Sequence, residues 1–184
     1  MNEVLTTIQN RFSCRGYDGR PIEREKIEAM AKAGLQAPSA MNLQPWEIIV
    51  ITDKALIDEM DDAAMDTLAA NRDKISYDRI MGRGGKIFYN APCMFIVMKD
   101  TSAKWADVDC GIVTQNISLA ATSMGLDNVI VAMAAIPFNS PKGDDFKKRV
   151  GWPDGFEFGM GICVGYGNTT KEPHEINPDK VKYL

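Results

Sequence analysis

Histidine is almost absent from this sequence of 184 residues, which contains only His174. This argues against a Ser-His-Asp triad and against a zinc site with several histidines. The four cysteines, Cys14, Cys93, Cys110 and Cys163, lie far apart and form no CxxC pair. This spacing favours reduced thiols over a disulfide framework or a metal cluster. We expect no metal site, and we expect any chemistry to come from a bound cofactor.

The sequence has no excess of positive charge. Its formal net charge is -4 and its isoelectric point is near 5.1, whereas a nucleic-acid-binding face needs clustered lysine and arginine. We therefore expect no nucleic-acid partner. A local basic pocket for a phosphate remains open.

A long apolar run is also missing. The longest uncharged stretch, residues 110–126, contains several amides and hydroxyls and is about three residues too short to span a bilayer. The first residues, MNEVLTTIQNRFSC, show no basic-then-apolar segment and no small-residue cleavage site. We expect a cytoplasmic protein that does not enter the membrane.

What the sequence does contain is an alternation of helical and strand patterns. With 45% hydrophobic and 25% charged residues and no internal repeat, it predicts one globular domain over residues 1–184. Apolar spacing predicts a helix capped by Asp53 and helices at residues 2–10, 23–36, 105–126 and 144–150. Apolar runs predict strands at residues 46–51, 93–98, 129–132 and 157–164. This order favours α/β or α+β, with helices flanking a central sheet.

Three segments depart from an ordinary amphipathic pattern. Between about residues 69 and 86 the pattern weakens, and GRGGK at 82–86 predicts a mobile loop that covers a site. The tail from Asn168 is polar, so we expect it to wrap over a neighbouring surface and not to form its own core. Within residues 105–126, the absence of charge from residue 110 onward is typical of a helix buried on all sides.

Two segments have the residue types of a ligand site. In RFSCR, residues 11–15, two guanidiniums and a hydroxyl can converge on a phosphate, although a solvated loop would show the same residues. APSAMNLQPW, residues 37–46, places rigid polar donors beside an aromatic residue, which suits the polar edge of a heterocycle. A plain turn before a strand is the alternative explanation.

The chain resembles the nitroreductase family in four blocks that occur in the same order. The blocks are RFSCRGY, APSAMNLQPWEIIVI, DCGIVTQNISLAATSMGL and the late VGYG. The resemblance implies an α+β fold with three α/β/α layers, a central mostly antiparallel sheet and an interlocked homodimer. It also implies two FMN molecules at the subunit interface, tightly bound.

By this resemblance, the first block holds the flavin's phosphate, ribityl chain and pyrimidine edge. The residues implied are Arg11, Phe12, Ser13 and Arg15. The family often completes the phosphate site with an arginine or lysine after the GY segment. This chain offers three alternatives for that role, namely Lys171, His174 and, from the earlier loop, Lys86.

The second block is implied to come from the opposite subunit. Its Pro38, Ser39, Met41 and Asn42 would contact the flavin ring system and its side chain. Gln115 of the third block is also implied to bind the cofactor, while the rest of the uncharged helix would pack against its twin across the two-fold axis.

The implied activity is a ping-pong oxidoreductase that transfers hydride from NAD(P)H, through FMN, to an electron-poor small molecule such as a nitroaromatic or a quinone. No catalytic side chain is needed, because the flavin supplies the redox chemistry. Two alternatives stay open: a non-catalytic protein that binds or stores flavin, and a scaffold that has lost the ligand.

Overall fold

A four-stranded sheet forms the middle of the part of the protein that the structure describes. The structure is a computed structural model that describes residues 2–71, 74–172 and 174–184. The strands are β1 (Trp46–Ile51), β2 (Cys93–Asp100), β3 (Asp127–Val131) and β4 (Phe156–Gly165). The α-helices are α1 (Glu3–Asn10), α2 (Arg24–Leu35), α3 (Lys54–Ala70), α4 (Lys74–Met81), α5 (Ala106–Ser123) and α6 (Gly143–Val150). The short 3-10 turns are η1 (Ala40–Asn42), η2 (Ala132–Ala135), η3 (Pro137–Asn139) and η4 (Pro178–Lys180).

The sheet has the order β1-β2-β4-β3, and every neighbouring pair is antiparallel. Strand β2 is central, and all six residues of its CMFIVM run are 0% exposed. This run has no polar alternation because helices cover the strand on both faces. The sheet therefore needs a layer of helices on each side.

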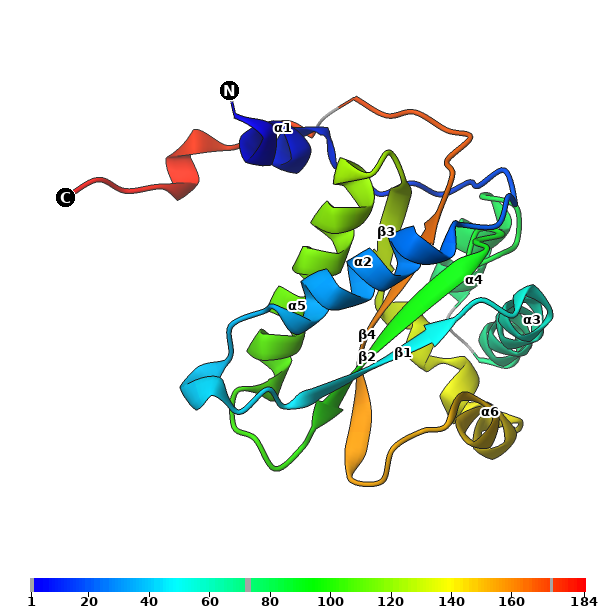
Figure 1. Cartoon of the computed structure of the whole chain (residues 1–184). Helices are drawn as coiled ribbons and strands as arrows, with labels where there is room; N and C mark the ends of the chain where they lie inside the picture. Colours follow the sequence, from blue (N-terminus) through cyan, green and yellow to red (C-terminus); the bar gives the residue numbers. More distant parts are fainter. Residues whose placement is uncertain (1, 72–73, 173) are drawn as a thin grey trace.

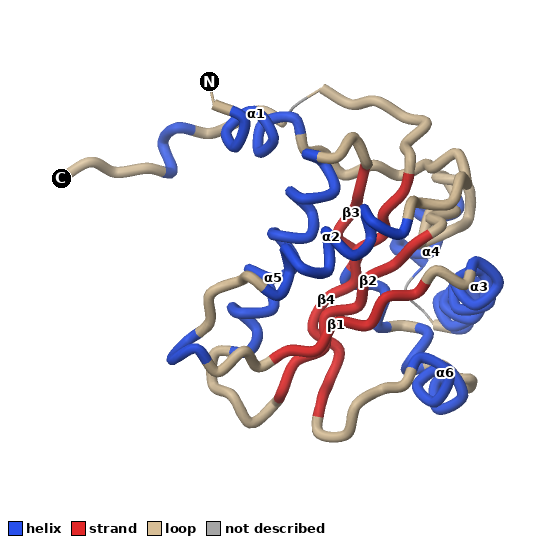
Figure 2. Tube along the Cα trace, viewed as in Figure 1, coloured by secondary structure: helices blue, strands red, loops and turns tan. Residues whose placement is uncertain are grey.

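Two separate clusters of apolar side chains fill these layers. Met94, Ile96 and Met98 of β2 pack with residues of α3 and α6 on one face. Phe95 and Val97 of β2 pack with residues of α2 and α5 on the other face. Figure 2 shows the sheet between these two groups of helices. The expected three-layer α/β/α arrangement is confirmed, and the expected strands all occur within a few residues of their predicted ends.

The predicted helix starts are also confirmed. Asn2 caps α1 by accepting the N–H of Leu5 at 3.0 Å, and Asp53 caps α3 by accepting the N–H of Ala55 at 3.0 Å. These side chains satisfy backbone donors that a helix leaves free in its first turn.

Two helices differ, within one chain, from what the sequence pattern indicates. The stretch with the weak pattern contains α4, whose Ile80 is 3% exposed and packs into the core, so tertiary contact stabilises a helix that local spacing did not reveal. Helix α5 is not buried on all sides: Val108 is 57% exposed, and Gly111 and Gln115 are exposed on the same helix. We call the exposed or half-buried residues Val108, Gly111, Ile112, Gln115 and Leu119 the α5 stripe.

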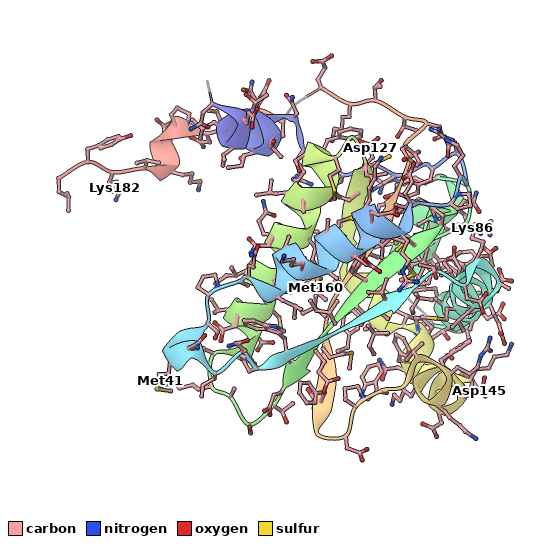
Figure 3. The ribbon with its side chains drawn as sticks, viewed as in Figure 1. Met41, Lys86, Asp127, Asp145, Met160 and Lys182 are labelled. Atoms are coloured by element: carbon pink, nitrogen blue, oxygen red, sulfur yellow. The ribbon has the colours of Figure 1, made fainter. Side chains whose placement is uncertain are left out.

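The tail leaves the body of the protein. Residues 176–184 project past α1, as Figure 2 shows, and Figure 3 labels Lys182 on this segment. Ile176 is 81% exposed and Tyr183 is 93% exposed. These two side chains therefore cover no surface of their own chain. The expectation that the tail wraps over a neighbouring surface stays a prediction. Among the described helices, none is both long and apolar enough to cross a membrane.

All four cysteines are buried and free. Burial raises the pKa of Cys93 to about 12 and that of Cys110 to about 11. Cys163 is 0% exposed, and its burial also raises its pKa well above the ordinary value. Since the thiolate is the reactive form, these three thiols are poor nucleophiles near neutral pH.

A buried carboxylate on α3 holds the segment that leads into β2. Asp61 is 1% exposed and accepts the N–H of Ile87 at 2.8 Å and the N–H of Phe88 at 3.4 Å. Burial raises the pKa of Asp61 to about 6, and the two N–H groups limit that rise. The folded protein therefore binds this proton more tightly than the unfolded chain does.

We predict that Asp61 makes the protein less stable as the pH rises. Between about pH 5 and about pH 7, the unfolding free energy of the wild type should fall by about 1–2 kcal/mol more than that of Asp61→Asn. The reason is that the unfolded carboxyl is already ionised at the lower pH, whereas the folded one loses its proton within this interval. Urea unfolding at both pH values measures the difference. The control is Asp62→Asn, which changes the neighbouring, exposed carboxylate. An equal pH dependence in wild type and Asp61→Asn would contradict it.

Candidate functional site

The segment that follows α1 lies against the ends of β3 and β4. Ser13 pairs with Asn128 of β3 as an isolated parallel bridge, and the N–H of Cys14 donates to the Asn128 carbonyl at 3.0 Å. Tyr17 pairs with Gly167, just after β4, as an isolated antiparallel bridge. These bridges bring the first sequence block beside the last one.

A cavity of about 350 Å³ lies where the two blocks meet. Its lining residues are Arg11, Phe12, Ser13, Arg15, Lys171, Glu172 and His174. The structure thus brings together the four predicted residues of the first block with two of the three alternatives for completing the phosphate site. We call this cavity the cationic cavity.

The cationic cavity has the donor set of an anion site. Two guanidiniums, one ammonium and the Ser13 hydroxyl line it, and these groups suit the oxygen atoms of a phosphate. Among the described residues, Arg11, Arg15 and Lys171 have no ion-pair partner. The lining also contains the Glu172 carboxylate, which repels an anion, but the three cations outnumber it.

Close backbone packing places Lys171 at this cavity. The N–H of Asn168 donates to the Gly16 carbonyl at 3.0 Å, and the N–H of Gly167 donates to Oδ2 of Asp127 at 3.2 Å. A Cβ on Gly167 would collide with the Asp127 carboxylate and with Sγ of the buried Cys14, so this position favours glycine. A Cβ on Gly16 would meet the side chain of Asn168, which is exposed and can move. Burial raises the pKa of Asp127, which Figure 3 labels, and the Gly167 N–H opposes that rise.

The side chain of Asn128 fastens this end of the sheet to α5. Asn128 is 1% exposed; its Oδ1 accepts the Ser118 hydroxyl at 2.6 Å, and its Nδ2 donates to the Ser118 carbonyl at 3.0 Å and to Oγ1 of Thr122 at 3.1 Å. The sequence analysis did not single out this residue. An amide inside the apolar strand LDNVIV is the signal that would have found it, because a buried amide needs partners for all its polar atoms.

The second sequence block forms a loop at the other end of the protein. Figure 3 shows Met41 far from Asp127 and Lys86. The loop has left-handed backbone at three residues that are not glycine: φ is 52° at Met41, 54° at Asn42 and 49° at Gln44. Such backbone is strained and persists where the surrounding structure enforces it. Within one chain, the predicted contacts Pro38, Ser39, Met41 and Asn42 therefore do not reach the cationic cavity.

The remaining predicted residues also lie outside the cationic cavity. Gln115 is exposed in the α5 stripe. The ammonium of Lys86 forms an ion pair with Asp58 of α3 at 3.0 Å, which makes it a weaker candidate for the phosphate than Lys171. Neither Gln115 nor Lys86 therefore lines the cationic cavity within one chain.

Comparisons with known proteins agree with this geometry. The model of the nitroreductase family matches residues 8–166. A crystal structure of a nitroreductase with bound FMN from Desulfitobacterium hafniense is 44% identical, with a TM-score of 0.96 over 100% of this chain and 99% of that one. One from Bacteroides fragilis, also with bound FMN, is 25% identical, with a TM-score of 0.89 over 100% of both chains. An NADPH-flavin oxidoreductase of Vibrio harveyi is 25% identical over 189 residues, which are 94% of this chain and 69% of that protein.

The fold, the order of the four blocks and the extent of these matches define the class of protein. This chain belongs to the nitroreductase family.

We predict that Asn128→Ala destabilises the protein by about 1–3 kcal/mol, because Ser118 and Thr122 lose their buried partner. Urea unfolding monitored by tryptophan fluorescence measures the change. Ser123→Ala is the matched control, since the exposed Ser123 hydroxyl donates only to the Ala120 carbonyl of its own helix. A loss in Asn128→Ala no larger than in the control would refute the role of this amide.

Proposed function

We propose that this protein is an FMN-dependent oxidoreductase that transfers hydride from NAD(P)H, by way of bound FMN, to an electron-poor acceptor such as a nitroaromatic or a quinone. The observation that carries the proposal is the cationic cavity, where a hydroxyl and three cations without an ion-pair partner among the described residues surround one space. Family membership and the FMN named in two similar crystal structures support it. FMN supplies the hydride chemistry when it is bound.

The residues present fit the phosphate end of such a cofactor. Arg11 and Arg15 would neutralise the phosphate, Ser13 would donate a hydrogen bond, and Lys171 would complete the site from the segment after β4. Phe12 lines the same cavity and offers an aromatic surface. The chain's own role would be to bind and orient the cofactor, because FMN supplies the redox chemistry.

We propose that two copies form the complete site. Pro38, Ser39, Met41 and Asn42 lie far from the cationic cavity of their own chain, so a second copy would have to bring them to the flavin. The α5 stripe is an uncharged surface suited to a two-fold contact. Gly111 has no side chain to hold a partner helix away, and packing within the chain does not require glycine there, since a Cβ would meet nothing within 4 Å. Gln115 would lie in that contact.

Further apolar surface continues from the α5 stripe. Helix α1 has no buried residue and exposes Val4 (63%), Leu5 (51%) and Ile8 (49%). A cavity of about 370 Å³ lies between α1, α2 and α5, where a partner's side chains would fit. The projecting tail exposes Ile176 and Tyr183, and a second copy would cover them.

We predict that Arg11→Ala and Arg15→Ala each weaken FMN binding by about tenfold or more, since each removes a charge-assisted contact to phosphate. Titration of the flavin-free protein, followed by quenching of FMN fluorescence, measures the dissociation constant. Cys14→Ser is the matched control, because Cys14 lies between them and is 0% exposed. Wild-type affinity in both arginine variants would show that the phosphate binds elsewhere.

The activity is tested by recording the absorption spectrum of the purified protein and adding NADH or NADPH without oxygen. We expect a yellow protein that bleaches and recovers its colour when a nitroaromatic or a quinone is added. A colourless protein that ignores added FMN would refute flavin binding. A yellow protein that neither nucleotide bleaches would favour the alternative of a flavin-storage protein.

We predict that Gly111→Lys converts a dimer into a monomer of about 20.3 kDa, because it places a charge in the α5 stripe. Light scattering coupled to size exclusion measures the mass. Ala69→Lys is the matched control, since Ala69 is also a small, exposed helical residue but lies on α3, on the other side of the sheet. A wild type that already elutes as a monomer would overturn the dimer proposal.

A further inference from the structure

A second buried carboxylate lies on α5, at the end opposite to Asn128. Asp109 is 4% exposed, and its Oδ1 accepts the N–H of Ala40 at 3.3 Å. Among the described residues it has no ion-pair partner. Burying an unpaired carboxylate is costly, so its single long-range hydrogen bond points to a specific task.

The hydrogen bond ends in the strained loop. Inside residues 38–44, the Gln44 N–H donates to Oγ of Ser39 at 2.9 Å, and the Asn42 N–H donates to the Ser39 carbonyl at 3.0 Å. These bonds shape the loop but do not fix it to the body. In the described part of the chain, the bond from Ala40 to Asp109 is the one hydrogen bond that joins residues 38–44 to a distant element.

The position of Asp109 suits this task. It lies in the first turn of α5, where the helix dipole favours a negative charge. Its neighbours in the helix are fixed by the core, since Cys110 and Val113 are at most 2% exposed. The carboxylate is therefore a rigid acceptor, and the loop that it holds contains Met41 and Asn42, both with left-handed backbone.

We propose that Asp109 is a positioning residue that holds the loop of residues 38–44 in the conformation that meets the flavin of a second copy. The proposal rests on the proposed function. Asp109 acts through the Ala40 N–H and does not touch the cofactor itself. Without this acceptor the loop relaxes from its left-handed backbone, and the partner's flavin loses preformed contacts.

The test compares two substitutions of Asp109 with a control on the same helix. Asp109→Ala removes the acceptor, whereas Asp109→Asn keeps an oxygen for the Ala40 N–H and removes the charge. Thr114→Val is the control: Thr114 is 3% exposed on α5, and its hydroxyl donates only to the Cys110 carbonyl of the same helix. Amide hydrogen exchange of residues 38–44 is measured on the flavin-free protein, and the FMN dissociation constant by titration.

We expect Asp109→Ala to speed exchange in residues 38–44 and to weaken FMN binding by about ten- to hundredfold. Asp109→Asn should restore slow exchange and bind FMN within about threefold of wild type, and Thr114→Val should match wild type in both measurements. The proposal is overturned if Asp109→Ala exchanges or binds like wild type, if Asp109→Asn is as impaired as Asp109→Ala, or if Thr114→Val shows the same defect.

The two measurements keep this inference separate from the proposed function. If the wild type binds no FMN, the proposed function fails and Asp109 has no flavin site to serve. If the wild type binds FMN and Asp109→Ala binds it equally well, the function stands and the role of Asp109 is wrong. Faster exchange in Asp109→Ala, with weaker binding by the same variant, supports both.

Discussion

Hydrogen bonds to two buried side chains of α5, at opposite edges of its buried surface, hold the two predicted parts of the candidate site. Near its start, Asp109 accepts the N–H of Ala40 in the strained loop. Near its end, Ser118 is bonded to Asn128, whose carbonyl accepts the N–H of Cys14 next to the cationic cavity. Ser118 lies nine positions after Asp109 along the helix, a rise of roughly 14 Å. A rigid helix of fixed length therefore sets how the two parts are spaced.

The same helix supports the proposal that the site is completed by a second copy. Its buried surface fastens both parts, but it keeps them at opposite ends of the molecule (Figure 3). Its other face is the uncharged α5 stripe, which contains Gly111 and remains exposed in the single chain. In the proposed dimer each α5 would anchor the cationic cavity of one site and the loop of the other. A change at the helix contact would then reach both sites through a few hydrogen bonds.

Features encoded by local sequence were predictable, and features that depend on distant contacts were not. The run CMFIVM predicts a buried strand because nothing polar interrupts it, and Asp53 predicts a helix start because a carboxylate caps free N–H groups. Helix α4 escaped prediction because Ile80 packs onto a core whose partners lie elsewhere in the chain. In the site, the motif RFSCR revealed its cations directly. Asn128 could have been singled out as an amide inside an apolar strand. The role of Asp109 could not be predicted, because its partner Ala40 lies 69 residues away in sequence.

The burial of all four thiols makes the protein a convenient background for site-directed labelling. Cys14, Cys93, Cys110 and Cys163 are shielded from a maleimide reagent in the folded state. A single cysteine introduced at Met41, which is 84% exposed, would take a spin label or a dye without removal of the native cysteines. Two such labels in one particle would report how far apart the loops of two copies lie in solution.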